Sequence, residues 1–230
     1  MLRLLTNEEI DILENNGCFA EDWSRIKVGN GFQPENVQRT KFYGDIRLMG
    51  NSSQLLVDGN IPMNCGVYDS VLNNCEIGKD VLIERVSLLS NYIISPHTII
   101  RNVQKLAIEG ETSFGNGVEV SVMDETGGRK IPIYNRLSAV LAYIAVFYRY
   151  KPEIINVIQH MVADYVASIN TRQGFVGEGT IIEGCGNLIN IRVGENAELM
   201  QVTHLKNCSI NSASYAPVKI MNVFAEHYSV

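Results

Sequence analysis

A seven-residue pattern of apolar and polar positions occurs four times along the chain. The segments are "LNNCEIG" from Leu72, "LSNYIIS" from Leu89, "LINIRVG" from Leu188 and "LKNCSIN" from Leu205. Each reads leucine, any residue, asparagine, apolar residue, any residue, isoleucine or valine, and a small residue. Within each pair the starts lie 17 residues apart. Such regular spacing is typical of repeat proteins, in which each unit stacks on its neighbours.

The pattern predicts strands that end in sharp turns. An aliphatic residue followed by glycine, asparagine or serine suits a tight corner, because glycine and asparagine accept positive φ values. If the units stack in register, the aliphatic side chains form buried columns worth about 1.5–3 kcal/mol per side chain, and the asparagines form a ladder along a corner. We therefore predict a mainly β fold, a parallel β-helix solenoid. Ordinary strands of a β-sandwich with a coincidental repetition are the alternative.

The first residues have a helical pattern. Thr6 and Glu9 have the spacing of a capping box, and Gly17 is typical of a helix end. We therefore predict a short N-terminal helix over residues 1–16.

A second helical pattern runs from about Asn135 to Ile169. The stretch "RLSAVLAYIAVFYRY" (136–150) is apolar on almost every side and too short to cross a bilayer, so we expect it to be buried against the solenoid or another subunit. Pro152 suits the first turn of a second helix. One face of that helix is apolar; it carries Ile154, Ile155, Ile158, Met161, Val162, Tyr165 and Ile169. The prediction is a helical hairpin inserted into the solenoid.

These patterns divide the chain into four segments. Residues 1–64 are an N-terminal helix and an irregular or β capping segment, and 65–133 are the first β-helix coils. Residues 134–170 are the helical hairpin, and 171–230 are further coils of one continuous solenoid. Because the repeats run to the last residues, we expect either a piece of a longer protein or a last strand capped by a partner.

Composition and charge exclude several classes of protein. The chain has 230 residues, a formal charge of −6 and 19% charged residues, without the basic patch of a nucleic-acid binder. Acidic residues within the short apolar start argue against a signal peptide or membrane anchor, so a cytoplasmic protein is expected. No CxxC pair occurs, so the cysteines predict neither disulfides nor a metal site. The cysteines are Cys18, Cys65, Cys75, Cys185 and Cys208.

Three stretches resemble the hexapeptide repeat of left-handed β-helix proteins: "EIGKDVLIE" (76–84), "FVGEGTII" (175–182) and "RVGENAEL" (192–199). In that superfamily three hexapeptides make one triangular turn, and a spacing of 17 corresponds to a turn with one residue deleted. The left hand of the solenoid is implied by this resemblance alone. Met221 departs from the pattern, since it stands where glycine is expected.

A longer likeness covers almost the whole chain. The segments "LTNEEIDILENNGCFAEDWSRI", "FGNGVEVSVMDETGGR" and "INSASYAPVKI" are similar to an uncharacterised bacterial family of long, acyltransferase-like hexapeptide-repeat proteins, carried as a domain of unknown function. The resemblance implies a homo-oligomer, a trimer by analogy, with no tightly bound cofactor and with acyl-CoA as co-substrate.

The same resemblance implies a histidine as general base, a role that suits a side chain titrating near neutral pH. Of the four histidines, His97 lies beside a corner marked by Pro96, and His204 precedes an inward leucine and is expected to point outward. His160 is expected on the solvated side of its helix, and His227 is close to the terminus. We take His97 and His204 as the candidate bases, with exposed surface histidines as the alternative.

A glycine turn beside an arginine is the other candidate site. In "DETGGRK", the backbone N–H groups of Gly127 and Gly128 and the guanidinium of Arg129 could hold a phosphate or carboxylate. The alternative is a turn leading from the solenoid to the helices, with Arg129 paired to a neighbouring carboxylate.

Two functions are therefore open. One is an acyltransferase-like or sugar-nucleotide-related transferase with a histidine base and a small-molecule ligand. The other is a non-catalytic solenoid scaffold or assembly module that uses its apolar hairpin as a contact surface.

Overall fold

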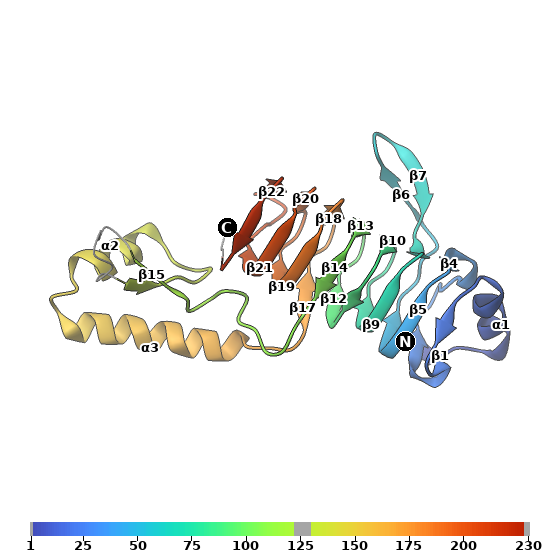
Figure 1. Ribbon diagram of the computed structural model, residues 1–230, viewed down its shortest axis with the longest axis horizontal. Coiled ribbons are helices and arrows are strands. Elements are labelled where there is room, and N and C mark those ends of the chain that lie inside the picture. The colour runs from blue at the N-terminus through green and yellow to red at the C-terminus, as the bar shows by residue number, and fades with distance from the viewer. Residues whose placement is uncertain (1, 122–129, 228–230) are drawn as a thin grey trace.

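The computed structural model describes residues 2–121 and 130–227, which are mainly β with three α-helices (Figure 1). The helices are α1 (Asn7–Asn15), α2 (Ala139–Phe147) and α3 (Pro152–Ile169), and two 3-10 helices are η1 (Trp23–Arg25) and η2 (Pro34–Asn36).

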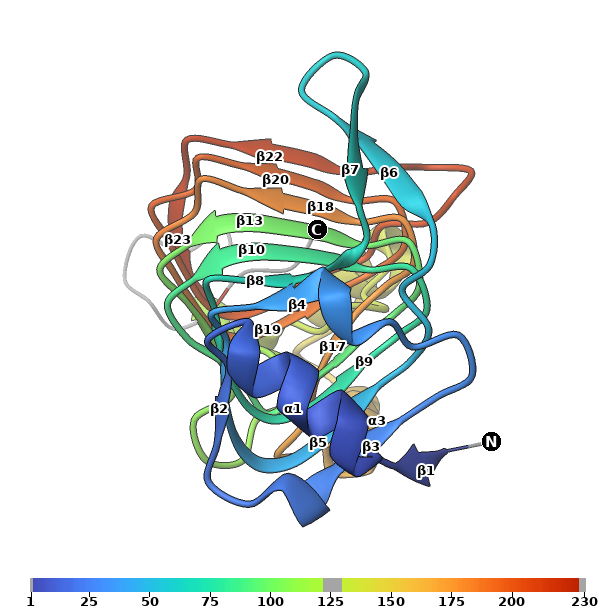
Figure 2. The same cartoon turned by 90° about the vertical axis from the view of Figure 1, so that its right-hand side faces the viewer.

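Most strands belong to two large sheets, in which every pairing is parallel except that of β1 with β3. One sheet has twelve strands: β1 (Arg3–Leu4), β2 (Phe19–Ala20), β3 (Ile26–Val28), β5 (Lys41–Leu48), β9 (Val71–Ile77), β11 (Leu89–Ser90), β12 (Tyr92–Ile94), β14 (Lys105–Ala107), β17 (Gly174–Val176), β19 (Asn187–Val193), β21 (His204–Ile210) and β23 (Phe224–Glu226). The other has seven: β4 (Val37–Gln38), β8 (Gly66–Tyr68), β10 (Leu82–Val86), β13 (Ile99–Val103), β18 (Ile181–Glu183), β20 (Glu198–Met200) and β22 (Lys219–Met221). Figure 2 shows these seven strands layered one above another, with α1 lying across one end.

Two antiparallel hairpins complete the described strands. One consists of β6 (Gln54–Val57) and β7 (Ile61–Asn64), and the other of β15 (Glu119–Ser121) and β16 (Lys130–Pro132). The β6–β7 hairpin projects from the stacked strands (Figure 1).

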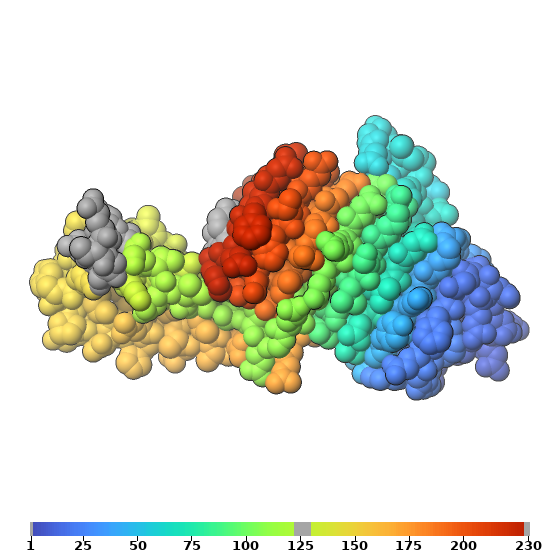
Figure 3. Space-filling model, in the orientation of Figure 1, coloured from blue at the N-terminus to red at the C-terminus, as the bar shows by residue number. Residues whose placement is uncertain are grey.

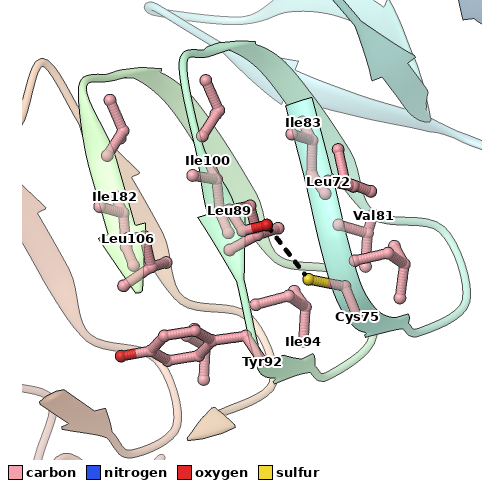
Figure 4. Packing of buried hydrophobic residues seen from close by; sticks show 14 of the residues in the cluster. Leu72, Cys75, Val81, Ile83, Leu89, Tyr92, Ile94, Ile100, Leu106 and Ile182 are labelled. Atoms are coloured by element: carbon pink, nitrogen blue, oxygen red, sulfur yellow. Dashed lines mark hydrogen bonds between the residues drawn. The ribbon is translucent and has the colours of Figure 1, made fainter. Parts of the chain in front are cut away.

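The repeated seven-residue segments lie side by side in parallel register. Leu72 pairs with Leu89, Leu89 with Leu106, Leu106 with Leu188, and Leu188 with Leu205. All five leucines are fully buried, and they form one column of the main core, part of which Figure 4 shows. Leu106 joins this column although its own segment lacks the asparagine of the seven-residue pattern.

Asparagines of the seven-residue pattern occupy the backbone corner that follows each leucine. Asn74, Asn91, Asn190 and Asn207 have φ values of 50°, 61°, 54° and 52°. The Nδ2 of Asn74 donates to Oδ1 of Asn91 (3.4 Å), and that of Asn190 donates to Oδ1 of Asn207 (3.1 Å). The structure thus confirms the predicted positive φ and the predicted ladder.

The predicted fold class, a left-handed β-helix solenoid, is wrong. The strands β9, β11, β14, β19, β17 and β12 close into a ring of six parallel strands, with the other sheets beside it. The ring closes because β9 and β19 bend. An asparagine with positive φ, Asn74 or Asn190, lies within each strand, so the two halves pair with different neighbours. The repeat revealed which segments are adjacent but not this closure.

The helix α1 confirms the predicted capping box but not the predicted range of 1–16, since it begins at Asn7 and Arg3–Leu4 form strand β1. The backbone N–H of Glu9 donates to Oγ1 of Thr6 (3.2 Å), and the N–H of Thr6 donates to the Glu9 carboxylate (2.9 Å). The predicted division of the chain at residues 64, 133 and 170 stays a prediction.

The helices α2 and α3 form a lobe with a small core of its own, beside the main one. Its buried members are Ile131, Tyr134, Ala145, Val146, Ile158 and Val162. The helices therefore pack on the β15–β16 hairpin and not on the stacked strands, so the first of the two expected partners is wrong. Burial against another subunit stays a prediction. Figure 3 shows this helical lobe projecting from the stack. No helix in residues 2–121 and 130–227 combines the length and the apolar character that a membrane span requires.

A buried arginine holds the β6–β7 hairpin to the stack. Arg101 of β13 donates from Nη1 to Asp58 (2.7 Å) in the turn of this hairpin. It also donates to Glu183 (3.1 Å) from Nη1 and to Glu84 (2.9 Å) from Nε. The Arg101 side chain is only 9% exposed, and its three carboxylate partners compensate the cost of removing its charge from water.

Candidate functional site

His97 occupies a backbone corner. It has φ of 57°, its side chain is exposed, and its N–H donates to the carbonyl of Lys79 (3.1 Å). No side-chain hydrogen bond of His97 occurs in the described parts of the chain. The imidazole therefore stands at the surface without a group to orient it.

The corner position of His97 recurs on the neighbouring strands. Asp80, Gly179 and Asn196 take the same place after their strands, with φ of 53°, 67° and 51°. The N–H of Asn196 donates to Glu178 (2.8 Å), the counterpart of the bond from His97 to Lys79. A shared conformation with glycine and asparagine at the other corners indicates a backbone role for His97.

His204, at the start of β21, lies beside a carboxylate. Its Nε2 is 3.2 Å from Oε1 of Glu226, and its ring stacks on Phe224 with 4.8 Å between centroids. Both partners belong to β23, and they leave the His204 side chain 18% exposed. The sequence predicted an outward-facing imidazole but not the glutamate that would orient it.

The remaining predicted residues lie apart from these. His160 is exposed on α3, with Nδ1 2.7 Å from the carbonyl of Asn156, and the N–H of His227 donates to Lys206 (2.9 Å). The predicted anion site of Gly127, Gly128 and Arg129 lies outside the described residues.

Among the described residues, no three His, Cys, Asp or Glu side chains gather as a metal site requires. The expectation of no metal is still a prediction.

A groove of about 470 Å³ lies between the helical lobe and the stacked strands. On the strand side, Phe175, Arg192 and Ser209 occupy equivalent positions of β17, β19 and β21. The guanidinium carbon of Arg192 lies 5.8 Å from the centroid of the Phe175 ring. The Oγ of Ser209 donates to Phe114 (2.9 Å), so this hydroxyl is engaged in the wall and is no free nucleophile.

The opposite wall comes from the lobe. Arg136 lies over the ring of Tyr165 at 4.7 Å, and both line the groove. The hydroxyl of Tyr165 donates to Oδ1 of Asn135 (2.6 Å), which fixes the segment before α2. Asn135 and Asn211 then bond reciprocally across the junction, at 3.3 Å and 3.0 Å. We call this hollow the Arg136–Arg192 groove.

Sequence reasoning did not identify this groove. Arg136 appeared only as the start of an apolar helical stretch, and Arg192 as a polar position in a repeat. Each arginine alone resembles an ordinary surface residue, so only the tertiary fold brings them together.

A family model described as "Domain of unknown function (DUF4954)" matches residues 2–230. The chain is also similar to an "Uncharacterized protein" of Treponema pallidum (strain Nichols), with 24% identity over 232 residues. That match covers 95% of this chain and 32% of the relative, so the chain spans about a third of the relative's length.

Proposed function

Because the chain belongs to the DUF4954 family, we propose from its geometry that it is a non-catalytic assembly module that self-associates through α2. The single observation that carries this proposal is an apolar surface on the helical lobe. On α2, Val140 is 69% exposed, Tyr143 55% and Phe147 49%. We call these three residues the α2 patch.

The side chains of the α2 patch form one continuous surface on the side of α2 that faces away from the core of the lobe. The rings of Tyr143 and Phe147 stack with 4.4 Å between centroids, while Ala145 and Val146 of the same helix face the core of the lobe. Contiguous exposed apolar surface of this kind marks an interaction site more often than scattered single side chains do.

A second copy of the chain fits the patch best. The α2 sequence "AVLAYIAVF" contains no charged residue, so two copies can approach without repulsion and without a partner of opposite charge. In a two-fold dimer the same patch serves both subunits. Aromatic side chains are enriched at the centres of such interfaces.

Sedimentation equilibrium tests this assignment with the double variant Tyr143→Gln/Phe147→Gln. We expect the wild-type chain at twice the mass of its 25.6 kDa monomer and the variant as a monomer. Glutamine favours helix, so α2 is retained.

Leu56→Gln/Ile61→Gln is the matched control, because these side chains are 60% and 56% exposed on the distant β6–β7 hairpin. A monomeric wild-type chain, or a dimer that the α2 variant leaves intact, contradicts the proposal.

A second candidate, an acyltransferase-like enzyme, is favoured by the contact between His204 and Glu226. With its Nε2 proton held by the carboxylate, Nδ1 of His204 would take a proton from an acceptor hydroxyl or amine. The acceptor atom then bonds to the acyl carbon, and the thioester C–S bond breaks. The proton passes from Nδ1 of His204 to the departing sulfur, so that coenzyme A leaves as the thiol. A trimer in the sedimentation experiment would favour this candidate.

Isothermal titration with acetyl-CoA tests this candidate. It predicts saturable binding, and acyl transfer to amino sugars that His204→Ala abolishes. His97→Asn is the control, because Asn196 holds the same corner conformation. An absence of acetyl-CoA binding, or full activity of His204→Ala, rejects His204 as the base.

A further inference from the structure

We propose that the Arg136–Arg192 groove binds a phosphate-bearing small molecule of the size of a nucleoside diphosphate. The site is independent of the α2 patch, and it goes beyond the proposed assembly function.

The first argument is charge. Among the described residues, seven arginines pair with a carboxylate: Arg3, Arg25, Arg39, Arg47, Arg85, Arg101 and Arg172. Neither Arg136 nor Arg192 has a described carboxylate within ion-pair distance, although both line one hollow. Two uncompensated guanidinium groups that converge on a groove favour an anion there.

The second argument is orientation. Each of the two guanidinium groups lies against an aromatic ring, Arg136 against Tyr165 and Arg192 against Phe175. Ring contact steadies the planar group and leaves its N–H edge available, and that edge matches two phosphate oxygens at once. The two arginines come from opposite walls, so a ligand with two phosphate groups can engage both.

The third argument is rigidity. The reciprocal bonds between Asn135 and Asn211, and the bond from Tyr165 to Asn135, tie the lobe to the strands beside the groove. The N–H of Asn135 also donates to Oδ1 of Asn116 (2.7 Å). Walls fixed before binding reduce the entropy that a ligand must overcome.

The size and rim of the groove indicate more than bare phosphate. Its volume of about 470 Å³ suits a small organic ligand. Tyr215 lines the groove and is 91% exposed, so its ring offers a free face to a planar base. Glu195 is the one carboxylate among the lining residues and could accept hydrogen bonds from ribose hydroxyls.

In a second polar hollow, of about 430 Å³, the arginines are paired with carboxylates. Its arginines Arg47 and Arg172 donate to Glu76 and Glu111, both at 3.0 Å. The contrast between the two hollows supports the choice of the Arg136–Arg192 groove.

Isothermal titration of the full chain tests the proposal, with ADP, UDP, pyrophosphate and uridine as probes. We expect saturable binding of a nucleoside diphosphate, weaker binding of pyrophosphate and none of uridine. Arg136→Gln and Arg192→Gln should each weaken nucleoside diphosphate binding at least about tenfold, which corresponds to about 1.4 kcal/mol.

Arg172→Gln is the matched control, since it removes an exposed arginine outside the groove and should leave affinity unchanged. Thermal unfolding of each variant confirms that it is folded. The proposal is overturned if neither ADP, UDP nor pyrophosphate binds, or if the double variant Arg136→Gln/Arg192→Gln binds as well as the wild-type chain. Repeating the titration on Tyr143→Gln/Phe147→Gln separates this result from the fate of the assembly proposal.

Discussion

At the scale of single residues, asparagine at the corners combines two properties. It tolerates positive φ, and its amide bonds to the neighbouring strand. Asn190 accepts from the N–H of Glu109 (2.8 Å) and donates to Asn207 (3.1 Å). These properties were predictable from the repeated seven-residue pattern, because both follow from local chemistry and regular stacking.

We expect Asn190→Ala to lower the free energy of unfolding by about 3–4 kcal/mol. Alanine loses the amide bonds, worth about 1 kcal/mol each, and bears the cost of a left-handed conformation, about 1–2 kcal/mol. Asn190→Gly loses the bonds but avoids the conformational cost, so urea unfolding should show a smaller effect. Equal effects of the two substitutions would mean that backbone conformation is not limiting at this corner.

Cys75 gives the core a pH dependence. Burial raises the pKa of its thiol to about 11 from an ordinary value of 9.0. Since the folded chain holds this proton more tightly than the unfolded chain, the contribution is complete below pH 9 and is lost as pH rises towards 11. We expect urea unfolding of Cys75→Val to show a shallower loss of stability than the wild-type chain over that range. Parallel pH curves for the two proteins would contradict this origin.

His97 shows where residue-level reasoning fails. The sequence marks a histidine beside a proline corner, and chemistry alone makes it a candidate base. The structure places it in a column with Asp80, Gly179 and Asn196, where backbone conformation explains the position. A single sequence shows the chemistry of a side chain directly, but it does not show the backbone φ that the residue adopts.

At the scale of elements, neighbouring strands fit closely at Tyr92 and Gly174, which pair in register between β12 and β17. The Tyr92 ring is fully buried, and its hydroxyl donates to the carbonyl of Ile191 (2.8 Å). A Cβ on Gly174 would come within 2.3 Å of this ring. Glycine is therefore required here by contact with a neighbouring side chain.

Gly174→Ala should destabilise the protein by about 1–3 kcal/mol through overpacking. In the double variant Gly174→Ala/Tyr92→Leu the ring is gone, so the two costs should be less than additive in urea unfolding. Additive costs would show that the alanine does not act through Tyr92.

The helices were predictable as elements, and the pairing of the strands only in part. The capping box of α1 and Pro152 of α3 are local signals, and both stand where the pattern placed them. The hairpins β6–β7 and β15–β16 join neighbouring segments that the repeated pattern does not mark. The closure of six strands into a ring depends on contacts between distant segments. A repeat spacing does not encode the contacts that close the ring, which is why the predicted solenoid was wrong.

At the scale of the whole molecule, the chain has a large core among the stacked strands and a small core in the helical lobe. The lobe carries the α2 patch on its surface, while the Arg136–Arg192 groove lies where it meets the strands. The sequence predicted the apolar hairpin as a contact surface but not which side of α2 is left exposed. The groove could not be placed, since it depends on the docking of the lobe.

Hydrogen exchange tests the central claim, self-association through α2, most directly. The 230-residue wild-type chain and Tyr143→Gln/Phe147→Gln would be compared at the same high concentration. We predict slower exchange of the α2 amides in the wild-type chain, with unchanged exchange in the stacked strands. Identical α2 exchange in both proteins, or concentration-dependent protection confined to the strands, would contradict the account.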